Sequence, residues 1–199
     1  MERYVITISR QFGSLGRSIA QKLAELLNIE FYDRDIVEAT AKRLGQPVSV
    51  ISNEEEHANP IFFGRQYPLG MGLLSMQEEI FSVQKNIIRD LATRESCIIV
   101  GRCANCILKD LPRSLNVYIY APYEKRLHNC TEILGMDTKT AKKYIKEVDR
   151  ARENYRKRHC AETTSVMDGY DIMIDSSKFG VEGTATMLVD IIRKKFIEG

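Results

Sequence analysis

The segment from Ser9 to Ala20 has the residue types of a phosphate-binding loop. It reads Ser-Arg-Gln-Phe-Gly-Ser-Leu-Gly-Arg-Ser-Ile-Ala, and it lies between the β-branched run Val5–Ile8 and a helical pattern. Glycines at such a turn let the backbone approach a phosphate, and the N–H groups of a helix N-terminus bind anions. The segment therefore predicts a nucleotide-binding set made of Gly13, Ser14, Leu15, Gly16, Arg17, Ser18 and Ile19.

The loop departs from the pattern G-x-x-x-x-G-K-[ST] of nucleotide-binding loops at two positions. It keeps Gly16 and Ser18, but it has Gln11 at the first glycine and Arg17 at the lysine. An arginine can still bridge phosphate oxygens, so Arg17 is a catalytic candidate, and Ser18 is placed to ligate Mg²⁺. A glycine pair between a strand and a helix is often only a turn, and the sequence leaves that alternative open.

Charged residues follow two further strand-like runs. Asp33 comes after Ile29–Tyr32, and Arg102 comes after Cys97–Val100. Open α/β folds bind ligands at the carboxyl ends of their strands. Asp33 could therefore order the water shell of Mg²⁺ or accept a hydrogen bond from an acceptor, and Arg102 could project into the cleft. The alternatives are a helix cap for Asp33 and a surface salt bridge for Arg102.

An arginine-rich helical segment lies near the end of the chain. Arg152 and Arg156 are four residues apart and share a helix face, whereas Arg150 and Arg158 are turned away from that pair. Catalysis of phosphoryl transfer rests on positioning and charge stabilisation, which a lid carrying guanidinium groups would supply. A solvated helix face is the alternative, and no aromatic stacking motif accompanies the arginines to favour RNA binding. The catalytic candidates are Arg17, Arg150, Arg152 and Arg156, with Arg126 as a further one.

Strand-like and helical runs alternate along the chain. Strands are predicted for Val5–Ile8, Ile29–Tyr32, Cys97–Val100, Val117–Tyr120 and Tyr170–Asp175. Helices are predicted after Gly16, from Asp33 to about Leu44, and at about 75–94, 102–109, 122–134, 138–158 and 181–197. This alternation predicts a three-layer α/β fold with a parallel five-stranded sheet.

The stretch from Pro47 to Gly72 interrupts the alternation. It mixes prolines and glycines with large apolar side chains, which predicts a mobile insertion. A packed surface loop, a substrate flap and a subunit contact are all compatible with it. Phe62, Phe63 and Met71 could lie at a homodimer contact or in the core.

Length and charge exclude several classes of protein. A chain of 199 residues fits one domain, and 29 basic against 27 acidic residues are too balanced for general binding to nucleic acid or anionic membranes. No apolar run approaches the roughly 20 residues of a membrane span, and the chain opens directly on a strand pattern. We therefore expect a cytoplasmic protein with neither a nucleic-acid nor a membrane partner.

The five cysteines do not suggest a disulfide framework. Their number is odd, so reduced thiols are expected. Cys103 and Cys106 form a C-x-x-C pair, which would suit redox chemistry or zinc, but no second pair completes a metal site. Buried or inert thiols are the prediction.

Three motifs together resemble the cytidylate kinase-like family, relatives of bacterial cytidylate kinase among the P-loop nucleoside monophosphate kinases. The resemblance extends over nearly the whole chain. It implies one P-loop kinase domain over residues 1–199, with an acceptor-binding insertion at about 35–94 and a lid at about 123–165. It also implies that ATP, with Mg²⁺, donates its γ-phosphoryl group to a nucleoside monophosphate, CMP or dCMP first. The motifs are Ser9-Arg10 with Gly13-Ser14-Leu15-Gly16-Arg17, Phe31-Tyr32-Asp33-Arg34-Asp35, and Ile99-Val100-Gly101-Arg102.

The resemblance also assigns roles to individual residues. It implies that Asp33, Arg34 and Arg102 bind the acceptor and that Ser18 and Asp33 hold the metal. Cys103 stands where the family has the aspartate of a Gly-Arg-Asp motif, and a thiol cannot replace a carboxylate as acceptor for the amine of cytosine. The alternatives are a kinase of another small acceptor, a non-catalytic nucleotide sensor and a thiol-redox protein.

Overall fold

A parallel sheet of five strands forms the centre of the molecule, as the alternation predicted. The computed structural model describes residues 2–56, 73–160 and 167–198. The strand order is β2-β3-β1-β4-β5, and Ile8 of the central strand is paired with Val100 on one side and Val117 on the other. The carboxyl ends of β1, β3 and β4 therefore lie next to one another. The strands are β1 (Val5–Arg10), β2 (Glu30–Tyr32), β3 (Cys97–Val100), β4 (Ser114–Tyr120) and β5 (Ile172–Asp175).

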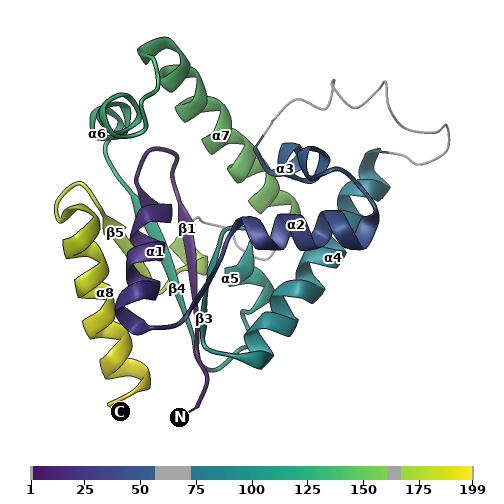
Figure 1. Cartoon of the computed structure of the whole chain (residues 1–199), viewed down its shortest axis with the longest axis horizontal. Helices are drawn as coiled ribbons and strands as arrows, with labels where there is room; N and C mark the ends of the chain where they lie inside the picture. Colours follow the sequence, from purple (N-terminus) through teal and green to yellow (C-terminus); the bar gives the residue numbers. More distant parts are fainter. Residues whose placement is uncertain (1, 57–72, 161–166, 199) are drawn as a thin grey trace.

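Helices cover both faces of the sheet (Figure 1). Ile6 and Ile8 pack with α1 (Gly16–Leu27) and α8 (Gly180–Phe196) on one face, whereas Val5 packs with α4 (Leu73–Arg94) and α5 (Ala104–Ile107) on the other. Alternate residues of β1 are thus buried on opposite faces, which explains its run of β-branched residues. Among the described residues, no helix is both long enough and apolar enough to cross a bilayer.

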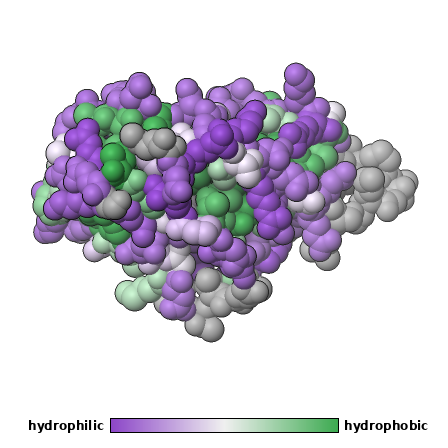
Figure 2. All heavy atoms as spheres, turned by 90° about the horizontal axis from the view of Figure 1, so that it is seen from below, coloured by the Kyte–Doolittle hydropathy of each residue, from purple (hydrophilic) through white to green (hydrophobic). Residues whose placement is uncertain are grey.

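The remaining helices gather near the carboxyl ends of the strands. They are α2 (Arg34–Leu44), α3 (Val48–Glu56), α6 (Tyr123–His128) and α7 (Thr138–His159), and a π-helical turn, Asn129–Ile133, continues α6. Figure 1 shows α7 running across this end of the sheet. Figure 2 views the molecule from below, where hydrophilic residues cover most of the surface and apolar residues form separate patches between them.

Helix α3 corrects the prediction of a mobile insertion that starts at Pro47. Ile51 of α3 is fully buried against Val37 and Ala41 of α2 and Ile80 of α4. These contacts come from other elements, so the local sequence gave no sign of them. The rest of the insertion, 57–72, with the predicted contact residues Phe62, Phe63 and Met71, lies outside the described residues.

A disulfide bond joins Cys106 and Cys160, and the prediction of reduced thiols is wrong at these two positions. The bond connects Cys106 of α5 to Cys160, the residue directly after α7. The two cysteines are 54 residues apart in sequence, and their Cα atoms are 5.8 Å apart. Cys97, Cys103 and Cys130 are buried thiols that form no disulfide bond in the structure, as predicted. The C-x-x-C spacing did not reveal this pairing, because only the fold brings the end of α7 to α5.

Candidate functional site

The predicted phosphate loop joins β1 to α1 at the carboxyl edge of the sheet. Gly13 and Leu15 both have positive φ angles, 78° and 59°, so the chain turns sharply into the helix. The first N–H groups of a helix have no partner within the helix and are available to an anion. Here they border a cavity of about 520 Å³. We call this cavity the loop hollow; its lining includes Arg10, Gly13, Gly16, Arg17, Ser18 and Asp33.

Two of the predicted nucleotide-binding residues face the interior instead of the loop hollow. Ser14 is fully buried, and its hydroxyl donates to the carbonyl oxygens of Gln11 and Ile119, at 2.9 and 3.3 Å. Ile19 is a core residue, and its N–H donates to the carbonyl oxygen of Leu15 at 3.0 Å. Ser14 and Ile19 therefore shape the loop. The others line the loop hollow, namely Gly13, Leu15, Gly16, Arg17 and Ser18.

Arg10, the last residue of β1, extends from the loop to the end of β3. A Cβ atom at Gly16 would lie 2.6 Å from Cβ of Arg10, and one at Gly101 would lie 2.3 Å from its Nη1. Glycine at both positions therefore makes room for this arginine. Arg10 was not predicted as a site residue, although its place at the end of the central strand was a usable signal.

Backbone strain is concentrated at the same two strand ends. Four non-glycine residues in the described ranges have positive φ angles, and three of them are Leu15, Arg102 and Cys103. This conformation costs about 1 kcal/mol or more for residues with a Cβ atom, and such strain clusters at functional sites. The turns after β1 and β3 thus have the character of ligand-binding turns.

Three guanidinium groups converge on Asp33. Nη1 of Arg102 donates to Oδ1 at 2.5 Å, Nε of Arg17 lies 2.8 Å from Oδ2, and Nη2 of Arg10 lies 3.8 Å from Oδ1. Asp33 is only 7% exposed, and burial alone would raise its pKa. The cations of Arg102 and Arg10 outweigh burial, so the pKa of Asp33 lies below its ordinary value. The side chain of Asp33 makes no cap hydrogen bond to α2, so the alternative of a helix cap does not hold. Arg102 forms a buried ion pair with Asp33, so the alternative of a surface salt bridge does not hold either.

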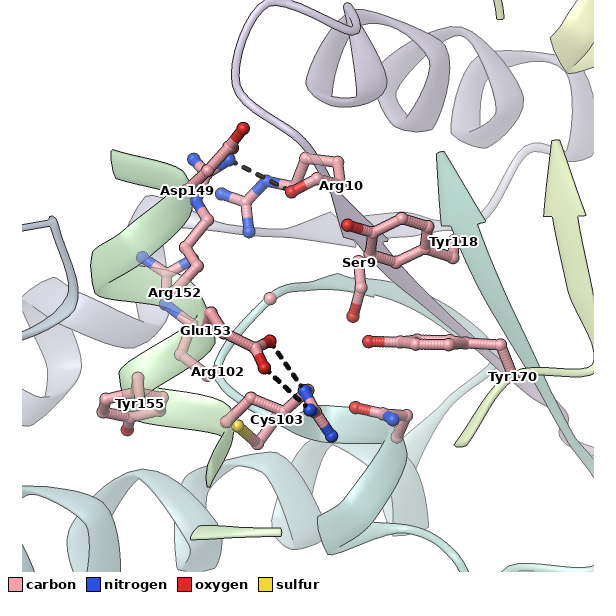
Figure 3. Close-up of a pocket in the computed structure, with 13 residues that line it drawn as sticks. Ser9, Arg10, Arg102, Cys103, Tyr118, Asp149, Arg152, Glu153, Tyr155 and Tyr170 are labelled. Atoms are coloured by element: carbon pink, nitrogen blue, oxygen red, sulfur yellow. Dashed lines mark hydrogen bonds and ion pairs between the residues drawn. The ribbon is translucent and has the colours of Figure 1, made fainter. Parts of the chain in front are cut away.

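A second, smaller hollow is lined by tyrosines and by residues of α7 (Figure 3). It holds about 260 Å³, and Tyr118 and Tyr170 have ring centroids 5.0 Å apart. Burial raises the pKa of Tyr118 to about 12 and also raises that of Tyr170, so both hydroxyls keep their protons and can donate. We call this cavity the tyrosine hollow; its lining includes Ser9, Cys103, Tyr118, Tyr155, Arg156 and Tyr170.

Helix α7 brings two of the predicted lid arginines to these hollows. Nη1 of Arg152 donates to the carbonyl oxygen of Arg10 at 3.2 Å (Figure 3). Arg156 lines the tyrosine hollow, and its Nη2 lies 3.0 Å from Oε1 of Glu153. Arg150 and Arg158 are exposed and are not among the lining residues of either hollow. The helix-face argument thus placed the four arginines correctly, and the structure does not bring Arg150 to the other catalytic candidates.

The predicted metal ligands border the loop hollow. Ser18 is exposed there, and the carboxylate of Asp33 lines the same cavity. Arg34, predicted to bind the acceptor, also lines the loop hollow, and its Nε lies 3.1 Å from Oε1 of Glu38. A hydroxyl and a carboxylate are hard oxygen donors that suit Mg²⁺ when phosphate oxygens and water complete its shell. The set is sparse. Among the described residues, no three or more His, Cys, Asp or Glu side chains form a cluster that could hold a metal ion.

Comparisons with known proteins agree with this geometry. The crystal structure of an uncharacterized protein from Eubacterium ventriosum is 28% identical, with a TM-score of 0.71, and the match covers 96% of this chain and 98% of that chain. A shikimate kinase from Acinetobacter baumannii, in complex with shikimate, is 14% identical with a TM-score of 0.55, over 98% of this chain and 96% of that one. A gluconokinase from Sinorhizobium meliloti is 13% identical with a TM-score of 0.53, over 100% and 99%.

The two kinases are too distant in sequence to show more than the fold, which is that of P-loop kinases. No curated protein matches the sequence. The model of the cytidylate kinase-like family matches residues 5–178, which confirms the resemblance seen in the three motifs. The chain therefore belongs to the cytidylate kinase-like family.

Proposed function

We propose that the protein is an ATP-dependent phosphotransferase that moves the γ-phosphoryl group of ATP to a nucleoside monophosphate, with CMP or dCMP as the first candidates. One observation carries the proposal: Arg10, Arg102 and Arg152 line both the loop hollow and the tyrosine hollow. A donor in the first hollow and an acceptor in the second would meet at these three cations. Phosphoryl transfer needs charge compensation at that meeting point.

The donor side of the reaction belongs to the loop hollow. The N–H groups at the start of α1 bind the phosphates of ATP, and Arg17 adds a guanidinium that is exposed enough to turn toward them. Ser18 and Asp33 are the residues that would hold Mg²⁺, which neutralises phosphate charge when bound. The loop, α1 and the end of β2 thus position the γ-phosphoryl group at the border between the hollows.

The acceptor side favours a phosphate oxygen over an alcohol as nucleophile. An alcohol must lose a proton to a base, but the three carboxylates that line the hollows, those of Asp33, Asp149 and Glu153, are all paired with arginines. Hydrogen bonds and charge also keep the pKa of Asp33 and that of Glu153 below their ordinary values. A phosphate oxygen is already ionised and needs no base. It attacks the γ-phosphorus in line, the bond to ADP breaks, and Arg102 holds the acceptor phosphate.

A kinase of another small acceptor is the second candidate, because Cys103 lines the tyrosine hollow at the position where cytidylate kinases have an aspartate. Without that carboxylate, nothing at position 103 accepts a hydrogen bond strongly from the cytosine amine. An acceptor with a different ring would fit the same three tyrosines.

A screen of ATP consumption tests the proposal. The purified protein is supplied with ATP, Mg²⁺ and, in separate reactions, each nucleoside monophosphate, shikimate, gluconate or another small alcohol. We expect ADP to form with at least one monophosphate and with none of the alcohols. Turnover with an alcohol alone would favour the second candidate, and ATP binding without any turnover would favour a nucleotide sensor.

Two substitutions in α7 make the screen specific. Arg152→Ala removes a cation that lines both hollows, and we expect turnover to fall about 100-fold or more. Lys146→Ala removes an exposed cation from the same helix and serves as the matched control, with activity retained. Equal activity of the two variants would contradict the role of the shared arginines.

A further inference from the structure

We propose that Asp149 and Arg126 are positioning residues that fasten the phosphate loop to α7, so that the loop and the arginines of α7 act as one rigid unit. The inference rests on the proposed function, because it assigns these two residues a part in placing ATP against the arginines. Asp149 also borders the tyrosine hollow, but the role proposed here needs no contact with the transferred group. They act through the backbone of the loop.

An ion pair captures both backbone polar groups of Phe12. Oδ1 of Asp149 accepts the N–H of Phe12 at 2.7 Å, while Oδ2 pairs with Nη1 of Arg126. The same Nη1 atom also donates to the carbonyl oxygen of Phe12, at 3.3 Å. The peptide groups on either side of Phe12 are therefore directed toward α6 and α7, which leaves the loop hollow to the N–H groups from Gly16 to Ser18.

The neighbouring loop residue is packed against α6 and the π-helical turn. Nδ2 of Asn129 donates to the carbonyl oxygen of Gly13 at 2.8 Å. A Cβ atom at Gly13 would lie 2.8 Å from the carbonyl oxygen of Arg126 and 2.9 Å from Sγ of Cys130. The loop thus fits against these elements with no space for a side chain, and a shift of α6 or α7 would have to move the loop as well.

The burial of Arg126 holds the Asp149–Arg126 pair in place, while the side chain of Asp149 stays 27% exposed. Arg126 is only 9% exposed, and a buried guanidinium is costly unless a carboxylate pairs with it. Exposed pairs contribute little because solvent screens them, but this pair lies between the loop and two helices. The pair can therefore hold a defined geometry.

Gln11 is a further loop residue that another element holds in place. It stands where the common loop pattern has a glycine, and its backbone N–H and side-chain Oε1 bond to the end of β4, at Ile119 (3.0 Å) and Ala121 (3.2 Å). The first residues of the loop are thus held by other elements. Arg152, three residues after Asp149, reaches the carbonyl oxygen of Arg10 from the same helix. One segment of α7 therefore contacts the chain on both sides of Gln11.

Three variants test the proposal in the full-length protein. Asp149→Ala removes both contacts, Asp149→Asn keeps an oxygen that accepts the N–H of Phe12 but loses the charge opposite Arg126, and Glu147→Ala removes an exposed carboxylate from the same helix as the control. We expect the affinity for a non-hydrolysable ATP analogue and kcat to fall in Asp149→Ala by a combined factor of about 100. Asp149→Asn should fall between Asp149→Ala and the wild type, and Glu147→Ala should match the wild type.

Hydrogen exchange of the ligand-free protein separates this proposal from the proposed function. The amide of Phe12 should exchange faster in Asp149→Ala than in the wild type and Glu147→Ala, whether or not the protein turns over ATP. Faster exchange in a protein that neither binds nor consumes ATP would support the fastening and contradict the kinase. Unchanged exchange together with unchanged ATP affinity in Asp149→Ala would overturn the positioning role. A loss of thermal stability with unchanged affinity would show a structural role only, and would overturn it too.

Discussion

Nε of Arg17 lies 2.8 Å from Oδ2 of Asp33. The side chain at the lysine position of the loop is thus held by a carboxylate at the end of β2, yet it is 63% exposed. Solvent screens the exposed guanidinium of Arg17, and Arg10 and Arg102 also pair with Asp33, so Arg17 can exchange this carboxylate for phosphate oxygens at small cost. Arg17 is therefore the side chain that we expect to move when ATP binds.

Arg17→Ala should lower turnover by roughly two to three orders of magnitude, because it removes a charge at the transferred group. The midpoint of thermal unfolding should change little, since Arg17 is the exposed partner of the pair and Arg10 and Arg102 still compensate Asp33. Initial rates and melting curves of the same preparations check both statements. Arg17→Lys should recover part of the rate, and full activity of the alanine variant would remove Arg17 from the catalytic residues.

Asp33→Asn should destabilise the protein at neutral pH by about 3–5 kcal/mol, because it leaves the guanidinium groups of Arg10 and Arg102 without their shared carboxylate. The pKa of Asp33 is lowered in the folded state from 3.8. Its contribution to stability is therefore complete above that value and is lost as the pH falls through the folded-state pKa. Denaturant titrations should show the difference between the wild type and the variant shrinking in acid.

Asp35→Asn is the matched control for Asp33, because Asp35 is exposed two residues away. We expect a much smaller loss of stability than for Asp33→Asn at neutral pH, because this variant removes only an exposed charge in the first turn of α2. A stability difference for Asp33→Asn that stays the same in acid would contradict the ion-pair explanation.

The disulfide bond between Cys106 and Cys160 can be tested by counting the reactive thiols of the unfolded protein. Unfolded protein that has not been reduced should show three reactive thiols, and reduced protein five. Opening a closed loop of 54 residues should lower the free energy of unfolding by about 4 kcal/mol on the chain-entropy account. The double variant Cys106→Ser, Cys160→Ser should be insensitive to reductant, whereas five reactive thiols in the unreduced wild type would rule the bond out.

We expect the protein to lose stability in mild acid because of the buried imidazole of His159. Its ring stacks on Phe81 with centroids 3.8 Å apart, and burial, helped by Arg158, lowers its pKa to about 4. Between that value and 6.5 the unfolded chain binds a proton that the folded chain does not, so stability falls as the pH decreases through this window. His159→Phe keeps the stacking and should lose less stability between pH 7 and pH 5. Equal losses in both proteins would show that His159 is not the cause.

The centre of the sheet was predictable because β1 and β3 are buried on both faces and appear as short runs rich in β-branched residues. The runs Val5–Ile8 and Cys97–Val100 needed no tertiary information, and parallel pairing followed from the helices between them. Helix α3 was not predictable, because Ile51 is buried by residues of α2 and α4 and not by a local pattern.

The site was predictable where chemistry follows a strand directly. Asp33 and Arg102 are 69 residues apart, yet both follow strands, and strand order brings them into contact. The tyrosine hollow could not be predicted, because its tyrosines are far apart in the sequence and follow no common spacing. Tyr118 belongs to β4, Tyr155 to α7 and Tyr170 to the turn before β5. The same holds for Asp149, whose partner in the loop is 137 residues away.

Calorimetric titration of the protein with ATP and Mg²⁺ tests the central claim that the loop hollow is a donor site. The account predicts saturable binding at one site, weakened about tenfold or more by Arg17→Ala and unchanged by Lys146→Ala. The absence of any heat of binding with the wild type, at concentrations where it remains folded, would contradict the account and leave Gly13 to Ser18 as a turn between a strand and a helix.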